Sequence, residues 1–192
     1  MTRASPTPAP LSSDHLREVE AARTRAKKIR RAAGVATMSG WTLAIFAGVT
    51  LLGAIFGDFV ALVLGAGLGV LAFVELRGAK MVKTFDERGA RQLGFNQIAL
   101  GGFIVAYSAW SLYQATRTSP LASMGSTGDP GMDANIEQLS KGIAYGLYVI
   151  LGTTGVIVPG LTAWYYFSRQ KLIRQFVDET PRWVVDTLRA VG

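Results

Sequence analysis

The chain contains no cysteine, a single histidine and few charged residues for its length. The absence of cysteine in 192 residues excludes a disulfide scaffold, a cysteine-ligated zinc or iron–sulfur site and a cysteine nucleophile. Charged residues make up only 17% of the chain, whereas soluble domains average about 25%. A hydrophobic content of 49% excludes disorder as a description of the whole chain.

Positive charge is in excess, with 20 Lys and Arg against 13 Asp and Glu and a net charge of +7. A soluble nucleic-acid-binding domain interleaves its basic residues with apolar ones. Here the basic and apolar residues are segregated into separate blocks along the chain. We therefore expect no nucleic acid as a partner, and we expect a lipid bilayer instead.

Four apolar segments are long enough to cross a bilayer, whose core requires about 20 helical residues. They cover residues 35–56, 59–76, 95–114 and 142–167. Their residues are apolar on every side, whereas a helix in a soluble core has one apolar stripe and a polar opposite face. The sequence predicts an all-α polytopic membrane protein in which residues 35–168 form an antiparallel bundle of four transmembrane helices.

Three segments flank these spans. Residues 1–13 are rich in Pro, Ser and Thr and predict a disordered arm. Residues 14–34 predict a basic amphipathic helix, which could lie on anionic headgroups at the cytoplasmic face, pair with a partner helix, or remain a solvated flank. Residues 169–192 predict an amphipathic cytoplasmic tail, which could lie in the headgroup plane or pack back onto a cytoplasmic loop.

Lysine and arginine are distributed unevenly between the two sides of the predicted bundle. Eight lie before the first span, five lie between the second and third, and five follow the fourth; the opposite side has only Arg117 and Lys141. Basic residues concentrate on the cytoplasmic side of membrane proteins. We therefore expect both termini to be cytoplasmic.

The loop between the second and third spans contains a helix-start pattern. Thr84, followed three residues later by Glu87, matches a capping box. The pattern predicts Thr84 as the N-cap of a third helix that begins around Phe85.

Small residues recur at four-residue spacing in the first two spans. The candidate packing residues are Gly53, Gly57, Ala61, Gly65 and Gly69. Such spacing lets helix backbones approach closely in lipid. With only a two-residue turn between the spans, we expect these residues to pack the two helices together; a seam with a second copy or with another membrane protein is the alternative.

Glu75 has no cation three or four residues away with which it could pair on its own helix. A carboxylate at the edge of a span needs a partner from elsewhere or a proton. The candidates at the same expected depth are Arg91, Asn96, Gln97 and Arg169. The cluster could be a protonatable or substrate-contacting site, or Glu75 could pin the second helix to the third.

Nothing in the sequence predicts catalysis. The single histidine, His15, precedes all four spans, and no Ser–His or Asp–Asp pair is available within them. We therefore expect no catalytic residue, no bound cofactor and no metal site, and we do not expect an enzyme.

Four stretches of the chain together resemble a known pattern. They are Glu75-Leu76-Arg77-Gly78, Phe85-Asp86-Glu87-Arg88, Leu93-Gly94-Phe95-Asn96-Gln97-Ile98-Ala99-Leu100-Gly101 and Tyr107-Ser108-Ala109-Trp110. This region resembles an uncharacterised family of small bacterial four-span inner-membrane proteins with an E-L-x-G … LG-x-NQ pattern between two spans. The resemblance implies a bacterial inner-membrane location and places Glu75, Asn96 and Gln97 in one cytoplasmic-side cluster, but it implies no activity, cofactor or partner.

These observations favour an integral membrane protein with a structural or partner-binding role, of the scaffold or accessory type. The alternative is a small oligomeric transporter or channel that uses the cluster of Glu75, Asn96 and Gln97. A transport pathway usually contains several intramembrane ionisable groups, and these spans contain one.

The predicted topology can be tested with one introduced cysteine, because the chain has none of its own. With Gly125→Cys we expect labelling by a membrane-impermeant maleimide from the external side. Labelling only from the cytoplasmic side would overturn the topology.

Overall fold

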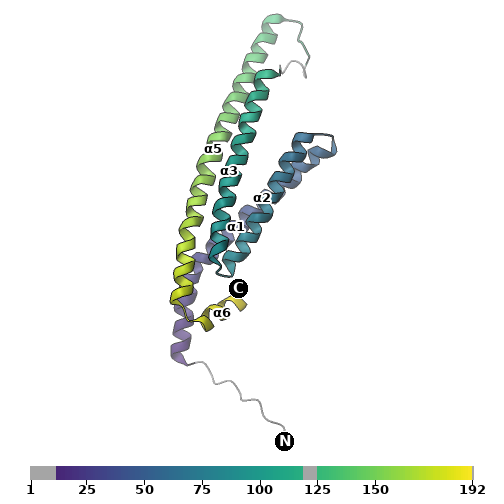
Figure 1. Cartoon of the computed structure of the whole chain (residues 1–192). Coiled ribbons are helices and arrows are strands. Elements are labelled where there is room, and N and C mark those ends of the chain that lie inside the picture. The colour runs from purple at the N-terminus through teal and green to yellow at the C-terminus, as the bar shows by residue number, and fades with distance from the viewer. Residues whose placement is uncertain (1–11, 119–124, 192) are drawn as a thin grey trace.

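The computed structural model of the protein describes residues 12–118 and 125–191, and all regular structure in these ranges is helical. The helices are α1 (Ser13–Ile55), α2 (Phe59–Lys83), α3 (Glu87–Arg117), α5 (Pro130–Glu179) and α6 (Arg182–Ala190) (Figure 1). The prediction of a disordered arm at residues 1–13 lies outside the described residues, except for Ser12 and Ser13.

Among the described helices, α1, α2 and α5 are long and apolar enough to cross a membrane, as expected of an integral membrane protein. Helix α3 has 31 residues but is not among them. Its apolar character is diluted by Arg91, Gln92, Asn96 and Gln97 in its first half. The fourth span therefore stays a prediction.

The basic segment and the first predicted span form one continuous helix. α1 begins after Ser12, whose hydroxyl accepts a hydrogen bond from the His15 amide. Its 43 residues correspond to about 65 Å at 1.5 Å per residue. Helix α5 has 50 residues and includes the first part of the predicted tail. Both helices are therefore longer than a bilayer core is thick, and they continue outside it.

The helices are arranged as two pairs rather than as one closed bundle (Figure 1). α1 packs along α2, and α3 packs along α5. The pairs contact each other mainly through α2 and α3, close to the turn that joins these helices, and they diverge toward the opposite end.

Small residues allow the close approach of α1 and α2. A Cβ atom added at Gly65 would lie 2.6 Å from Leu51 Cγ, and one added at Gly53 would lie 3.0 Å from Ala61 Cβ. Gly57 occupies the turn with a φ of +86°, a conformation that side-chain-bearing residues rarely adopt. The candidate packing residues thus lie within this helix pair.

The predicted capping box at Thr84 is wrong. Thr84 ends α2, and Asp86 is the N-cap of α3, with its carboxylate accepting a hydrogen bond from the Arg88 amide at 2.9 Å. Between them Phe85 has a φ of 61° and is buried, and its ring lies 4.9 Å from that of Phe176. Burial of this ring against α5 holds residue 85 out of a helical conformation, so the next helix begins two residues later.

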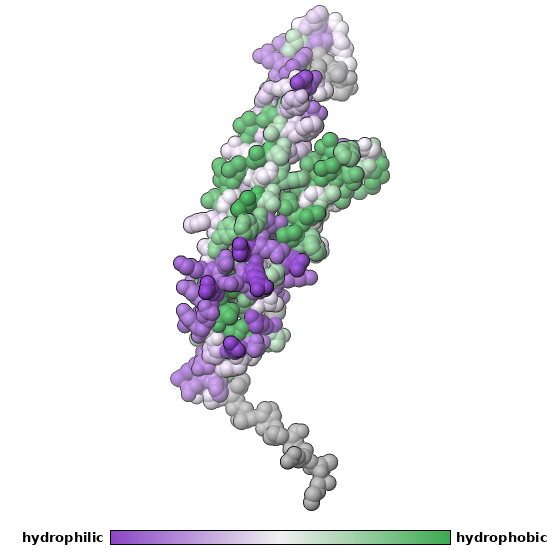
Figure 2. Space-filling view, viewed as in Figure 1, coloured by the Kyte–Doolittle hydropathy of each residue, from purple (hydrophilic) through white to green (hydrophobic). Residues whose placement is uncertain are grey.

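The hydrophobic core lies at the end where the described helices meet, which we call the base. Its buried members come from every helix and from Phe85: Ala22, Ala26, Ile29, Ala33, Ala36, Ala79, Val82, Phe85, Ala90, Leu93, Tyr166, Ile173, Phe176, Val184, Val185 and Leu188. Figure 2 shows a hydrophilic surface around the base and an apolar surface beyond it.

Helix α6 packs back onto the base. Its apolar side is buried, Arg30 donates a hydrogen bond to the Leu188 carbonyl at 2.9 Å, and Arg189 donates one to the Thr84 carbonyl at 3.0 Å. The sequence predicts that the tail either lies in the headgroup plane or packs back onto a loop. In the structure it packs onto the loop between α2 and α3.

At the opposite end Asp129 caps α5 and Asp133 orders the preceding turn. The Asp133 carboxylate accepts hydrogen bonds from the Ser126 hydroxyl at 2.6 Å and from the Thr127 amide and hydroxyl at 2.9 and 2.7 Å. These donors stabilise the charged form and hold the pKa of Asp133 below its usual value. Their contribution to order is present above the unfolded pKa and is lost as the pH falls through the lowered one.

The α3–α5 contact predicts opposite effects at two adjacent glycines. A Cβ added at Gly101 would lie 2.8 Å from the Gly155 carbonyl oxygen, whereas one added at Gly102 has no neighbour within 4 Å. We expect Gly101→Ala to reduce the free energy of unfolding by about 1–3 kcal/mol. Gly102→Ala should be neutral or stabilise by up to about 1 kcal/mol. Equal thermal unfolding temperatures of the two variants in detergent would contradict this packing.

Candidate functional site

Glu75 lies where the two helix pairs meet, and it is completely buried. Its carboxylate accepts hydrogen bonds from Asn96 Nδ2 at 2.6 Å, from Gln97 Nε2 at 2.9 Å and from the Tyr166 hydroxyl at 3.4 Å. Glu75 is on α2, the two amides are on α3, and Tyr166 is on α5. The carboxylate therefore joins three helices through side-chain hydrogen bonds.

Small residues on both helices bring α2 and α3 together beside this cluster. A Cβ added at Gly89 would lie 2.8 Å from the Gly78 carbonyl oxygen, and one added at Gly78 would lie 2.8 Å from Leu93 Cγ. Asn96 Nδ2 also donates to the Leu71 carbonyl at 3.1 Å, which fixes the amide against the backbone of α2. The Asn96 orientation is thus set by two acceptors on one neighbouring helix.

The cluster contains an acceptor surrounded by donors and no cation. Among residues 12–118 and 125–191, Glu75 makes no ion pair. A buried carboxylate without a counter-ion depends on hydrogen bonds to replace lost hydration. Three neutral donors from two other helices supply that replacement, so separating the helices would leave both the acid and the amides unsatisfied.

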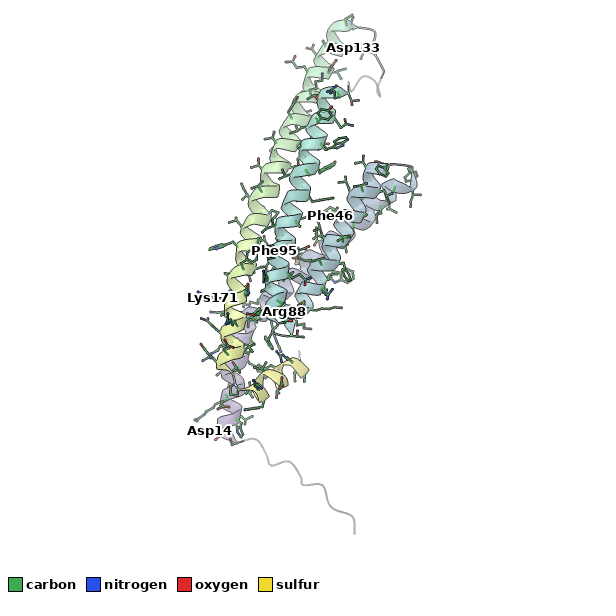
Figure 3. The ribbon with its side chains drawn as sticks, viewed as in Figure 1. Asp14, Phe46, Arg88, Phe95, Asp133 and Lys171 are labelled. Carbon is green, nitrogen blue, oxygen red and sulfur yellow. The ribbon has the colours of Figure 1, made fainter. Side chains whose placement is uncertain are left out.

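The structure brings together three of the five predicted cluster residues, namely Glu75, Asn96 and Gln97. Arg91 stacks over Phe95 at 5.7 Å from the ring centroid, and Arg169 stacks over Tyr165 at 4.6 Å. Both arginines thus contact aromatic rings outside the cluster. Figure 3 labels Phe95, the neighbour of Asn96 on α3, and shows it farther than Arg88 and Lys171 from the N-terminal end of α1.

Tyr166 is the member that sequence reasoning missed. It belongs to the run Trp164–Phe167, which resembles an interfacial aromatic belt. In the structure Trp164 is exposed while Tyr166 is completely buried. The two residues differ in burial because they point to different sides of the helix. The hydroxyl of Tyr166 could have indicated its role, because a buried tyrosine hydroxyl usually has a hydrogen-bond partner.

The arrangement holds three helices together and is closed to solvent. The clefts on the surface lie elsewhere. One of about 300 Å³, between α2 and α3 where the pairs diverge, is lined by apolar and aromatic residues, including Val60, Val63 and Phe103. In the described part of the chain, no group of three or more His, Asp or Glu side chains could hold a metal ion.

Comparison of the chain with protein-family models, with curated proteins and with solved structures finds no match. The class of protein therefore rests on its own features, which are those of an all-helical integral membrane protein.

The cluster predicts a large difference between two glutamines of α3. Gln97→Ala leaves one Glu75 oxygen without its amide donor, and we expect a loss of about 1–3 kcal/mol in the free energy of unfolding. Gln114→Ala, at an exposed position of the same helix, should change it by less than about 0.5 kcal/mol. Similar losses in denaturant titrations of both variants would refute the role assigned to the cluster.

Proposed function

We propose that the chain is a four-span protein of the bacterial inner membrane that acts as a scaffold or accessory protein. It anchors in the bilayer through α1, α2, α3 and α5 and presents the base to a partner in the cytoplasm. Both termini lie on the cytoplasmic side.

The observation that carries this proposal is the position of the core. Within the most apolar windows of α1, α2 and α5, only 11%, 22% and 11% of residues are buried inside the chain. The continuous hydrophobic core lies instead at the base, where α6 and the extended ends of α1 and α5 pack together. This ordered structure outside the apolar zone gives a partner a folded surface to contact.

Two features support α3 as the fourth span. α3 runs beside α5 for most of its length, so a bilayer crossed by α5 also surrounds α3 (Figure 1). Its amides, Asn96 and Gln97, are buried against Glu75 and are not exposed to lipid. These two amides therefore add little cost in a membrane.

The distribution of charge supports the orientation. The exposed basic residues Lys80, Lys83, Arg88 and Arg91 lie at the end of α2 and the start of α3, and Lys171 lies on α5 at the same end. Positive residues at one end of a helical bundle favour the cytoplasmic side and attract anionic headgroups.

The sealed cluster supports a structural role over transport. Glu75 has no exposed surface, and its oxygens are occupied by donors from α3 and α5. A transport site needs access from at least one side of the membrane. The transporter or channel alternative gains no comparable support from the geometry.

Purification in mild detergent followed by native mass analysis tests the proposal. We expect the chain to co-purify with a cytoplasmic or membrane protein in a defined ratio. We also expect liposomes that contain the chain or its Glu75→Gln variant to show the same proton flux, measured with an entrapped pH dye. A homo-oligomer without a partner, whose flux falls with Glu75→Gln, would contradict the scaffold proposal and favour the transporter.

A further inference from the structure

A groove of about 230 Å³ runs along the seam between α1 and α5 in the base. We call it the α1–α5 groove. Its walls include Thr24, Lys28 and Ile29 from α1 and Leu172, Gln175 and Phe176 from α5. Ile29 and Phe176 lie buried beneath the groove, and the partly buried Leu172 supplies apolar surface that a partner can reach. The groove offers an apolar surface outside the apolar zone of the molecule.

Cations border the groove. Lys28 lines it, and the exposed Lys171 precedes Gln175 by one helical turn, on the same side of α5. The one acid that lines it, Glu179, is paired with Arg25 at 3.3 Å. Lys28 and Lys171 form no ion pair within the described ranges. The groove therefore combines an apolar surface with unneutralised positive charge at its edge.

Most of the groove lies outside the bilayer. Lys28 lies seven residues before the predicted span that begins at residue 35, and Thr24 lies eleven residues before it. These separations correspond to about 10 and 16 Å along the continuous helix α1. The headgroup layer adds only about 5–8 Å on each side of the hydrocarbon core. A lipid headgroup can therefore reach only the membrane-proximal end of the groove.

We propose that the α1–α5 groove binds an amphipathic, acidic segment of a cytoplasmic protein. The proposal rests on the scaffold function and names the chemistry of its partner. Apolar side chains of the segment pack on Leu172, above the buried Ile29 and Phe176, and its carboxylates pair with Lys28 and Lys171. Helix-in-groove binding of this kind is a recurrent mode of peptide recognition.

A nucleic acid fits the same surface less well. Contacts to a phosphate backbone are electrostatic, so a nucleic acid would leave the apolar part of the groove without a binding partner. Charge complementarity together with an apolar groove thus favours a protein segment.

The test uses the full chain in nanodiscs of neutral phosphatidylcholine. The probe is a fluorescent helical peptide of about 15 residues, a length that sustains some helix in water, with leucines on one face and glutamates beside them. Binding is measured by fluorescence anisotropy at low salt. A second peptide, with every glutamate replaced by glutamine, reports the contribution of charge.

Two neighbouring lysines supply a matched pair of variants. Lys27 and Lys28 are both exposed, but only Lys28 lines the groove. We expect Lys28→Glu to weaken binding of the acidic peptide about tenfold or more. Lys27→Glu should weaken it by less than about twofold. Thr24→Trp, which fills the groove without changing charge, should also remove most of the binding.

Equal losses for Lys27→Glu and Lys28→Glu would overturn the proposal, because net charge alone would then explain binding. Equal binding of the glutamine peptide would overturn it as well. Duplex DNA that binds with the same dependence on Lys28 would identify a nucleic-acid surface, and phosphatidylglycerol that displaces the peptide through Lys28 would identify a lipid site. If the chain co-purifies with a partner but the acidic peptide does not bind, the groove assignment fails while the scaffold proposal stands.

Discussion

The hydrogen bonds to the buried Glu75 carboxylate are the interaction on which the arrangement of the helices depends. Asn96 and Gln97 donate from α3 and Tyr166 donates from α5, so one acceptor joins the α1–α2 pair to the α3–α5 pair. In an apolar environment an unsatisfied carboxylate or amide is costly, whereas apolar helix faces slide against lipid or against each other at little cost. The polar contact therefore fixes which faces of α2, α3 and α5 meet.

Around this contact the molecule divides into two zones with different packing. On one side lies the base, where α6 and the extended ends of α1 and α5 bury a continuous hydrophobic core. On the other side the helix pairs diverge and expose apolar side chains such as Phe46, Phe56 and Phe73. Figure 2 shows the apolar surface of this part of the molecule. The first zone excludes water as a soluble domain does, and the second presents its apolar surface to lipid. The α1–α5 groove belongs to the first zone.

The sequence predicted part of the candidate site because depth along a helix can be counted. Glu75 closes one apolar segment and Asn96 and Gln97 open the next, so they had to lie at the same level of the molecule. Counting residues along a predicted helix gives the depth of a residue along the helix axis, but it does not give the direction in which its side chain points. Arg91 and Arg169 lie near that level, yet their guanidinium groups stack on Phe95 and Tyr165. Tyr166, hidden in an aromatic run, points inward instead.

The sequence by itself determined the all-helical class and the long apolar helices, because hydrophobic run length and the segregation of charge are local properties of the chain. The absence of cysteine and the presence of a single histidine likewise followed from composition alone. Only the tertiary structure decided that α1 continues without a break from base to apolar zone, that α6 folds back, and that Phe85 moves the start of α3 to Glu87. These features depend on contacts between residues far apart in the chain, such as Arg30 with Leu188 and Phe85 with Phe176, and no local pattern encodes which of them form.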